Sequence, residues 1–189
     1  MVYHSKISSC VHALHSGGVI AYPTEAVWGL GCDPFNAEAV AYILELKQRA
    51  WQKGVILVAA EESQFEFILH DLEKEHREKM RASWPGHTTW LVPHQERIPQ
   101  WVCGEHDTIA LRVSAHPIVG ALCKAFNGPI VSTSLNPQGF PPALTQYKSR
   151  CYFSKRNTQE RPLTFAPGHV GAHGVPSQII DLLSGKIIR

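Results

Sequence analysis

Short apolar runs alternate with amphipathic stretches along this chain, which is the pattern of a sheet flanked by helices. Apolar side chains recur at helical spacing in 7–14, 40–46 and 119–126, and the charged stretch 72–82 is typical of a solvated helix. Five apolar runs have the length of buried strands: 19–22, 55–60, 89–92, 109–113 and 130–134. This order of elements predicts an open α/β sheet and argues against a helix bundle or a β-sandwich.

Turn and capping residues indicate where several of these elements begin and end. Gly17 and Gly18 should stop the first helix, and Asn36 can cap the second. Pro117 suits the first turn of a third helix. Residues 178–188 are expected to form a terminal hairpin.

Two stretches show no regular pattern. Residues Pro23 to Pro34 follow the first predicted strand and are expected to form a loop. Residues Pro141 to Val175 are rich in proline, glycine and polar side chains, so we expect a long irregular segment there.

Length and composition indicate a single domain spanning residues 1–189. The chain is 44% hydrophobic and 18% charged, which is ordinary for a globular protein, and no linker-like composition interrupts it. No stretch approaches the ~18 apolar residues of a membrane span, and none resembles a secretory signal. Five scattered cysteines without a C-x-x-C pair argue against a disulfide framework. We therefore expect a cytoplasmic protein with no membrane association.

Several classes of chemistry lack their usual motifs. The eleven histidines include no H-E-x-x-H pair, so no metal ligated by the protein is expected. A G-x-S-x-G elbow and a G-x-x-x-x-G-K-[ST] loop are also missing, which argues against Ser-His-Asp catalysis and a Walker-type ATP site. The net charge of +2 permits an RNA partner without predicting one.

A cluster of cations is the strongest local signal. Lys47, Arg49 and Lys53 have no acid between them. They can converge only if the predicted helix ends near Lys47, because residues two apart on a helix face different ways. Three converging cations suit a polyphosphate. A surface charge cluster at a helix C-terminus is the alternative.

Hydroxyl and amide side chains follow two predicted strands. Ser132, Ser134 and Asn136 lie at the end of the run 130–134, where open α/β sheets place ligands. They could bind phosphate, ribose or a carboxylate, or they could cap their own loop. Thr24 follows the first strand and is either a ligand contact or part of a simple turn.

An arginine lies inside an apolar strand. Arg112 and Thr108 belong to the sequence TIALR, and a buried unpaired charge is costly. The residues alone favour an internal Asp or Glu as the partner of Arg112. A bound carboxylate is the alternative.

Six segments together resemble the YrdC-like family, specifically its single-domain threonylcarbamoyl-AMP synthase (TsaC-like) branch. They occur in family order: VIAYPTEAVWGLGCDP, LELKQRAWQKGVILVAA, SWPGHTTWLVP, IALRVSAHP, PIVSTSLNPQG and PSQIIDLLSG. The match covers most of the chain and is weakest between Pro141 and Val175. The family signature K-x-R … K … S-x-N is present as Lys47, Arg49, Lys53, Ser134 and Asn136.

The resemblance implies a twisted mixed sheet flanked by helices, with a large basic concave cleft. It also implies a nucleotidyltransferase that uses L-threonine, bicarbonate and ATP. Threonine takes up bicarbonate as a carbamate, which attacks the α-phosphate of ATP and releases pyrophosphate. The product, threonylcarbamoyl-adenylate, would serve N6-threonylcarbamoyladenosine modification of tRNA together with tRNA threonylcarbamoyl-transferase proteins. Mg²⁺ would be carried by the ATP phosphates.

The resemblance also implies roles for individual residues. The catalytic set would be Lys47, Arg49, Ser134 and Asn136. The triphosphate would meet Lys47, Arg49 and Lys53, and the nucleotide would meet Ser134, Asn136 and Thr108. Threonine would be held by Thr24, Arg112, Ser132 and Ser177, with Arg112 at its carboxylate.

Three positions depart from the family pattern. Ala50 and His87 stand where proline is usual, and Leu135 replaces a small residue inside S-x-N. We expect a less rigid loop at Ala50 and crowding of the nucleotide by Leu135. The alternative function is an RNA-binding protein that uses the same basic cleft for tRNA or structured rRNA, which would make binding strongly salt-dependent.

Overall fold

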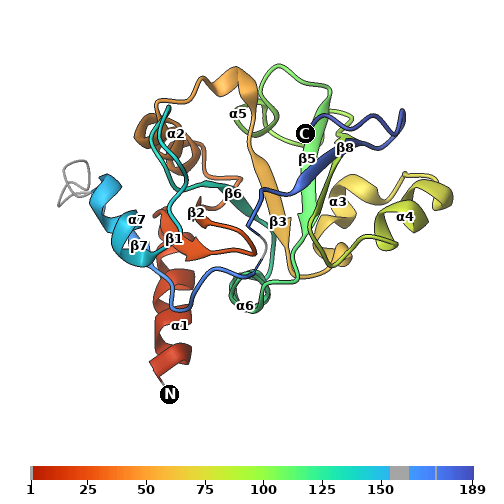
Figure 1. The fold of residues 1–189 in the computed structure, drawn as a ribbon. Coiled ribbons are helices and arrows are strands. Elements are labelled where there is room, and N and C mark those ends of the chain that lie inside the picture. The colour runs from red at the N-terminus through yellow and green to blue at the C-terminus, as the bar shows by residue number, and fades with distance from the viewer. Residues whose placement is uncertain (1, 154–161, 173) are drawn as a thin grey trace.

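The computed structural model describes residues 2–153, 162–172 and 174–189 (Figure 1). Its described strands form one eight-stranded sheet in the order β7-β1-β2-β6-β3-β5-β4-β8. The strands are β1 (Ile20–Pro23), β2 (Trp28–Gly31), β3 (Ile56–Ala59), β4 (Thr88–Pro93), β5 (Thr108–Val113), β6 (Ile130–Ser134), β7 (Thr164–Phe165) and β8 (Gln178–Asp181). Parallel and antiparallel pairs both occur, since β3 runs parallel to β5 and antiparallel to β6. The predicted α/β class with an open mixed sheet is confirmed.

Helices flank this sheet, and the four predicted helices appear in the predicted order as α1, α2, α4 and α6. They are α1 (Val2–His15), α2 (Ala37–Lys47), α3 (Glu66–Leu69), α4 (Lys74–Arg81), α5 (Gln100–Cys103), α6 (Pro117–Phe126) and α7 (Gln146–Phe153), with 3₁₀ turns η1 (Trp51–Lys53) and η2 (Glu62–Phe65). Figure 1 shows α1 and α6 together at the bottom of the view. Among the described residues, no helix has the length and apolar character needed to cross a membrane.

The predicted helix ends are confirmed where the local chemistry is strong. The side chain of Asn36 accepts a hydrogen bond from the Ala39 amide at 3.0 Å and caps α2. The helix α2 ends at Lys47 because Gln48 adopts a left-handed conformation, with φ of 52°. The chain therefore turns inside the K-x-R motif, as convergence of its cations requires.

Two predicted irregular stretches contain regular structure. The expected loop Pro23 to Pro34 includes β2, and the expected irregular segment Pro141 to Val175 includes α7 and β7. The strand β2 was predicted to be a loop because glycine is depleted in strands, and β2 has glycine at alternate positions, Gly29 and Gly31. Tertiary packing overrides that preference. Part of the second segment, 154–161 and 173, lies outside the described residues.

Side chains of the central strands alternate between two faces of the sheet. On β5, Ile109, Leu111 and Val113 belong to the larger apolar core. Leu57 on β3 and Val131 on β6 join them there. Apolar residues of α2, α3 and α5 belong to the same core, so this face is packed along the length of the central strands.

On the opposite face the strands are covered by helices at one end and line a cavity at the other. Val58 and Ile130 are register partners and belong to the smaller core formed with α1 and α6. Ile56 and Ser132 form the next pair on that face, and both line a cavity. The sheet therefore buries one end of this face under helices and presents the other end as a cavity floor.

The glycine at the end of β2 allows close packing of two neighbouring strands. A Cβ atom on Gly31 would lie 2.7 Å from both the Tyr22 ring and the Val131 carbonyl oxygen. Backbone oxygen cannot move aside as a flexible side chain can. A methyl group at this position would therefore force β1 and β6 away from β2.

We expect Gly31→Ala to lower the free energy of unfolding by about 1–3 kcal/mol, the usual cost of overpacking. Gly120→Ala is the matched control, because a Cβ at Gly120 in α6 would meet nothing within 4 Å. That control should stabilise the protein by about 0.5–1 kcal/mol, since alanine favours helices over glycine. Urea unfolding of both variants measures the difference. Equal effects of the two substitutions would contradict the packing argument.

Leu135 belongs to the protein core. Its side chain is fully buried in the larger core, and its amide donates to the Trp28 carbonyl oxygen at 2.8 Å. The expectation that Leu135 crowds the nucleotide is wrong. Alternation along the extended chain sends Leu135 to the core face, whereas its neighbour Ser134 lines the cavity.

We expect Leu135→Ala to destabilise the protein by about 2–5 kcal/mol, because it removes buried methyl groups and leaves a void. Thermal and urea unfolding measure the effect. An alanine variant of unchanged stability would show that the core collapses around the site at no cost. A gain in ATP affinity at unchanged stability would restore the crowding hypothesis.

Candidate functional site

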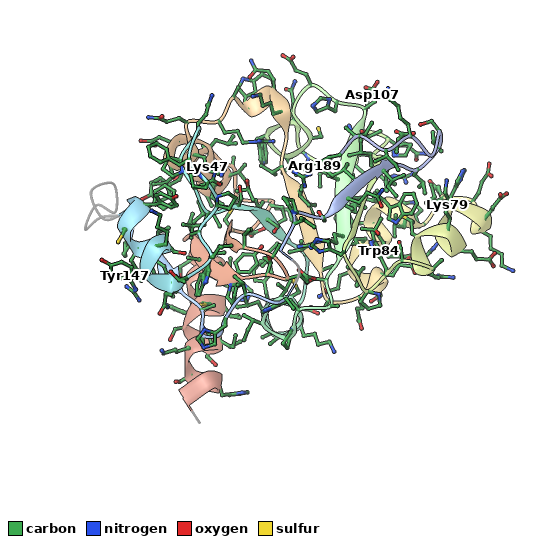
Figure 2. All side chains as sticks on the ribbon, viewed as in Figure 1. Lys47, Lys79, Trp84, Asp107, Tyr147 and Arg189 are labelled. Carbon is green, nitrogen blue, oxygen red and sulfur yellow. The ribbon has the colours of Figure 1, made fainter. Side chains whose placement is uncertain are left out.

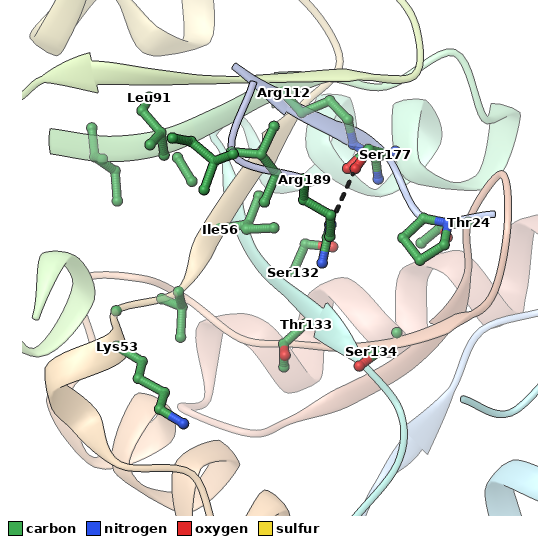
Figure 3. Close-up of a pocket in the computed structure, with 18 of the residues that line it drawn as sticks. Thr24, Lys53, Ile56, Leu91, Arg112, Ser132, Thr133, Ser134, Ser177 and Arg189 are labelled. Carbon is green, nitrogen blue, oxygen red and sulfur yellow. Dashed lines mark hydrogen bonds between the residues drawn. The ribbon is translucent and has the colours of Figure 1, made fainter. Parts of the chain in front are cut away.

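A cavity of about 470 Å³ opens over the part of the sheet not covered by α1 and α6. Its floor is formed by β3, β5 and β6, and its walls come from the chain after β1, the turn after α2 and the segment before β8. Figure 3 shows Lys53 on one side of this cavity, and Arg112, Ser177 and Thr24 on the opposite side. The cavity is therefore assembled from segments spread over most of the sequence.

Eight of the ten residues predicted for the site line this cavity. They are Thr24, Arg49, Lys53, Thr108, Arg112, Ser132, Ser134 and Ser177. On β5 the alternate positions Thr108, Ala110 and Arg112 line the cavity, whereas Leu111 belongs to the core; Ile109 belongs to the core and also borders the cavity. Lys47 and Asn136 are not among the lining residues. The structure therefore brings eight of the ten predicted residues together at one cavity, whose other lining residues were not predicted.

Arg49 shapes the turn that follows α2. Its Nη2 donates to the Gly54 carbonyl oxygen at 3.0 Å and to the Lys53 carbonyl oxygen at 3.3 Å. Burial, and then the charge of Arg189, lower the pKa of Arg49 below its ordinary value. Lys53 is exposed and lines the same wall. The turn thus presents one anchored and one exposed cation to the cavity.

Lys47 is buried against the strand-end turn of β6 (Figure 2). Its ammonium donates to the Ser134 carbonyl oxygen, to the Asn136 carbonyl oxygen at 3.0 Å and to Asn136 Oδ1 at 3.2 Å. Burial, followed by the charge of Arg49, lowers the pKa of Lys47 to about 8. The K-x-R and S-x-N motifs meet through this ammonium, which holds the turn behind the cavity wall.

Asn136 completes that turn and also faces away from the cavity. Its Oδ1 accepts from Ser134 Oγ at 2.6 Å, and its Nδ2 donates to the Phe140 carbonyl oxygen at 2.6 Å. The amide thus bonds to its own loop, the alternative that the sequence left open for this segment.

Arg112 has the internal partner that its sequence context favoured. Its Nη1 lies 3.0 Å from Glu25 Oε2, and both side chains are buried, at 6% and 5% exposure. Within the described residues, Arg112 Nε and Glu25 Oε2 are both buried without a hydrogen-bond partner, so the pair is held by charge. The ion pair therefore fixes one side of the guanidinium in a residue that lines the cavity.

The segment before β8 carries Ser177 into the cavity. Ser177 Oγ lies 2.9 Å from Thr89 Oγ1 on β4. Its carbonyl oxygen accepts from Arg189 Nη2 at 3.2 Å, the contact drawn in Figure 3. Burial, and then the charge of Arg112, lower the pKa of Arg189. Arg189 thus lies within electrostatic reach of both Arg112 and Arg49.

Sequence reasoning missed Arg189, His106 and Glu25 as parts of the site. Arg189 and His106 line the cavity, and Glu25 supports Arg112 behind it. Local sequence carries no signal for the first two. Glu25 lies in the quoted motif YPTE, and its carboxylate was the kind of partner expected for Arg112.

The structure places two of the positions that depart from the family pattern, Ala50 and His87. Ala50 has φ of −60°, a value that proline also adopts, so the backbone of the turn keeps a proline-compatible shape. His87 lines the cavity, and its Nε2 contacts the Val175 carbonyl oxygen at 2.7 Å. The expectation of a less rigid loop at Ala50 stays a prediction.

The lining is rich in positive charge. It includes Arg49, Lys53, Arg112 and Arg189, and within the described part of the chain no Asp or Glu lines the same cavity. The described residues also hold no group of three or more His, Cys, Asp or Glu side chains suited to a metal ion. Cations and hydroxyls at these positions can bind an anionic ligand that carries phosphate and carboxylate groups.

Known proteins resemble this chain over nearly its whole length. The family model of the Sua5/YciO/YrdC domain, described as telomere recombination, matches residues 12–189. A threonylcarbamoyl-AMP synthase of Saccharophagus degradans is 55% identical over 97% of this chain and 94% of its own length. The protein of the same name from Pseudomonas fluorescens Pf-5 is 47% identical over 100% of this chain and 99% of its own.

Solved structures share the fold. P. abyssi Sua5 complexed with L-threonine superposes with a TM-score of 0.82 at 28% identity, covering 93% of this chain. This chain spans about half of that Sua5 chain, 50% of its length. E. coli YciO matches with a TM-score of 0.81 at 25% identity, over 97% of this chain and 87% of its own. The chain belongs to the Sua5/YciO/YrdC family.

Proposed function

We propose that this chain is a nucleotidyltransferase that forms threonylcarbamoyl-AMP and pyrophosphate from L-threonine, bicarbonate and ATP. The observation that carries the proposal is a single cavity lined by separate cations suited to phosphate and to carboxylate. Relatives that are 45–55% identical and match almost end to end bear the name threonylcarbamoyl-AMP synthase. The product is an activated form of threonine for modification of tRNA.

The triphosphate would lie along the wall formed by the turn after α2. Arg49 and Lys53 line this wall, and Thr108 and Ser134 line the cavity with them. Arg49 is held by the backbone oxygens of its own turn, so its position does not depend on the ligand. A cation fixed in advance stabilises developing phosphate charge without having to reorganise.

Lys47 and Asn136 would act indirectly in this scheme. Both are bonded to the turn that carries Ser134 rather than exposed in the cavity. The resemblance assigns both residues to the nucleotide. Their contacts favour an indirect role, in which they hold the turn that presents Ser134 to the nucleotide.

Threonine would bind on the side of the cavity that holds Arg112. The guanidinium suits its carboxylate, while Thr24, Ser132 and Ser177 bring hydroxyls to the same side. P. abyssi Sua5 has been solved in complex with L-threonine, which supports an amino-acid site in this fold.

The chemistry requires the two substrates to meet in one enclosed space. Threonine's amine and bicarbonate form a carbamate with loss of water. A carbamate oxygen then attacks the α-phosphorus of ATP, a new P–O bond forms, and the bond to pyrophosphate breaks. Holding both reactants in line supplies much of the acceleration of such a step, and cations offset the phosphate charge.

We also propose that Mg²⁺ reaches the site on the ATP phosphates. The donor set fits this, because within the described residues the lining offers cations and hydroxyls but no carboxylate to hold a divalent ion. When bound, the ion would neutralise phosphate charge.

The RNA-binding alternative has less support. The relatives are named as synthases, and the cavity offers small-ligand groups such as Thr24 and Ser132. The proposal also includes a weaker interaction with tRNA and cooperation with tRNA threonylcarbamoyl-transferase proteins. It places the protein in the cytoplasm.

A product assay tests the function directly. The purified protein is incubated with ATP, Mg²⁺, bicarbonate and L-threonine, and threonylcarbamoyl-AMP is measured by mass spectrometry. We expect product that requires threonine and appears together with pyrophosphate. Binding of ATP and threonine without product would contradict the proposed reaction, and strongly salt-dependent RNA binding without either ligand would favour the alternative.

We expect Lys53→Met to weaken ATP binding by about tenfold or more, because a charge-assisted contact contributes about 1.5–3 kcal/mol. Lys53 is exposed, so the free energy of unfolding should change by less than about 0.5 kcal/mol. Lys124→Met, an exposed position on α6 outside this cavity, is the matched control. Calorimetry with ATP measures both variants. Equal ATP affinities would remove Lys53 from the phosphate site.

A further inference from the structure

A buried carboxylate lies directly behind the cavity at Arg112. Glu25 follows Thr24 in the turn after β1 and is 5% exposed. It does not line the cavity. Its carboxylate therefore acts on a ligand only through the residues that it contacts.

Each oxygen of this carboxylate has a separate task. Oε2 lies 3.0 Å from Arg112 Nη1. Oε1 accepts from Ser114 Oγ at 2.7 Å and from the Ala115 amide at 3.1 Å. The two contacts on Oε1 fix the carboxylate to the chain that leads into α6. Oε2 then holds one side of the guanidinium.

We propose that Glu25 is a positioning residue that holds Arg112 by Nη1, so that the guanidinium stays at the cavity wall where the carboxylate of the amino-acid substrate binds. The proposal rests on the proposed function, in which Arg112 binds that carboxylate. Its structural basis is the ion pair between Arg112 Nη1 and Glu25 Oε2 in a residue that lines the cavity. Among the described residues, Arg112 Nε and Glu25 Oε2 are both buried without a hydrogen-bond partner. The pair is therefore held by charge, and pairing is what allows a buried charge to stay in place.

The anchor of Glu25 extends into two other segments. Ser114 Oγ also accepts from the His116 amide at 3.1 Å. His116 caps α6 through Nδ1, and its Nε2 contacts the His169 carbonyl oxygen at 3.1 Å. A Cβ atom on Gly171 would lie 2.8 Å from the Glu25 carbonyl oxygen, so that segment packs closely on the turn. The turn that carries Glu25, and the Ser114 hydroxyl that anchors its carboxylate, are therefore packed against other segments.

The negative charge of Glu25 and its positioning of Arg112 predict opposite effects on anion binding when the carboxylate is removed. Burial raises the pKa of Glu25, but Arg112 and the Ser114 hydrogen bond outweigh burial and leave the pKa below its ordinary value. The group is thus ionised at neutral pH and partly offsets the charge of Arg112. Removing it would strengthen binding of an anion if charge alone mattered, and would weaken binding if position mattered more.

Glutamine is an informative replacement because every neighbour of the carboxylate is a donor. Ser114 Oγ and the Ala115 amide donate to Oε1, and the guanidinium of Arg112, a group with donors only, forms an ion pair with Oε2. An amide NH₂ group must face a donor on one side or the other. Glu25→Gln therefore keeps the size of the side chain and loses either its anchor or its hold on Arg112.

The test is a double-mutant cycle read by calorimetry. Glu25→Gln should weaken L-threonine binding by about tenfold or more and leave ATP binding within about twofold. In an Arg112→Met background, adding Glu25→Gln should change threonine affinity by less than about twofold. L-threoninol, which lacks the carboxylate, should bind equally to wild type and Glu25→Gln. Glu45→Gln, an exposed carboxylate on α2, is the control and should change nothing.

Other outcomes overturn the proposal in distinct ways. Equal losses for threonine and threoninol, or the same loss in both backgrounds, would make Glu25 a general structural residue. Tighter threonine binding by Glu25→Gln would show that charge outweighs position. Wild-type affinity in Arg112→Met would remove Arg112 from the carboxylate and leave the proposed reaction standing. Absence of threonine binding by wild type would overturn both.

A second variant covers the case in which Glu25→Gln does not fold. Ser114→Ala keeps the charge of Glu25 and removes one of the two bonds on Oε1. It should weaken threonine binding by a few-fold and spare threoninol and ATP, because the Ala115 amide still donates to Oε1 and the ion pair with Arg112 is retained. An unchanged threonine affinity in this variant would contradict the anchoring role.

Discussion

The site depends on a single constraint, which is the alternation of side chains along the central strands. One face of β3, β5 and β6 is packed against helices along its length, and the other face is covered by α1 and α6 at one end only. Val58 and Ile130 lie under these helices, and the next pair, Ile56 and Ser132, forms the floor of the cavity. A shift of one residue in register would exchange cavity and core positions on a strand. Fold stability and ligand binding therefore rely on the same register.

The cations near the cavity are satisfied by the protein to different degrees. Lys47 is bonded to oxygens of the Ser134 turn, Arg49 is bonded to its own turn, and Arg112 is paired with Glu25. Lys53 is exposed. Buried charge is tolerated only when it is paired, so each pairing also fixes where the charge lies. Arg49 and Arg112 are thus fixed by the protein and still line the cavity, whereas Lys47 holds the turn behind it.

The family relationship and the geometry support the same function. The relatives are named for an adenylate-forming reaction, and the cavity combines phosphate-type cations with an arginine suited to a carboxylate. The departures from the family pattern do not remove a charged group. Leu135 is a core residue, and Ala50 keeps a backbone shape that proline also adopts. Only His87 among them lines the cavity.

The sequence by itself determined the α/β class, the order of the helices α1, α2, α4 and α6 and of six of the strands, and eight of the residues that line the cavity. Those features follow from local periodicity, capping and motif content. The tertiary structure decided three matters: Lys47 lies behind the Ser134 turn, Glu25 is the partner of Arg112, and Arg189 joins the cavity. The Lys47–Asn136 contact joins residues 89 apart in the sequence. Such contacts depend on strand register and side-chain direction, which no local pattern specifies. For the same reason β2 was recognised only in the folded sheet, where the Tyr22 ring packs against its glycines.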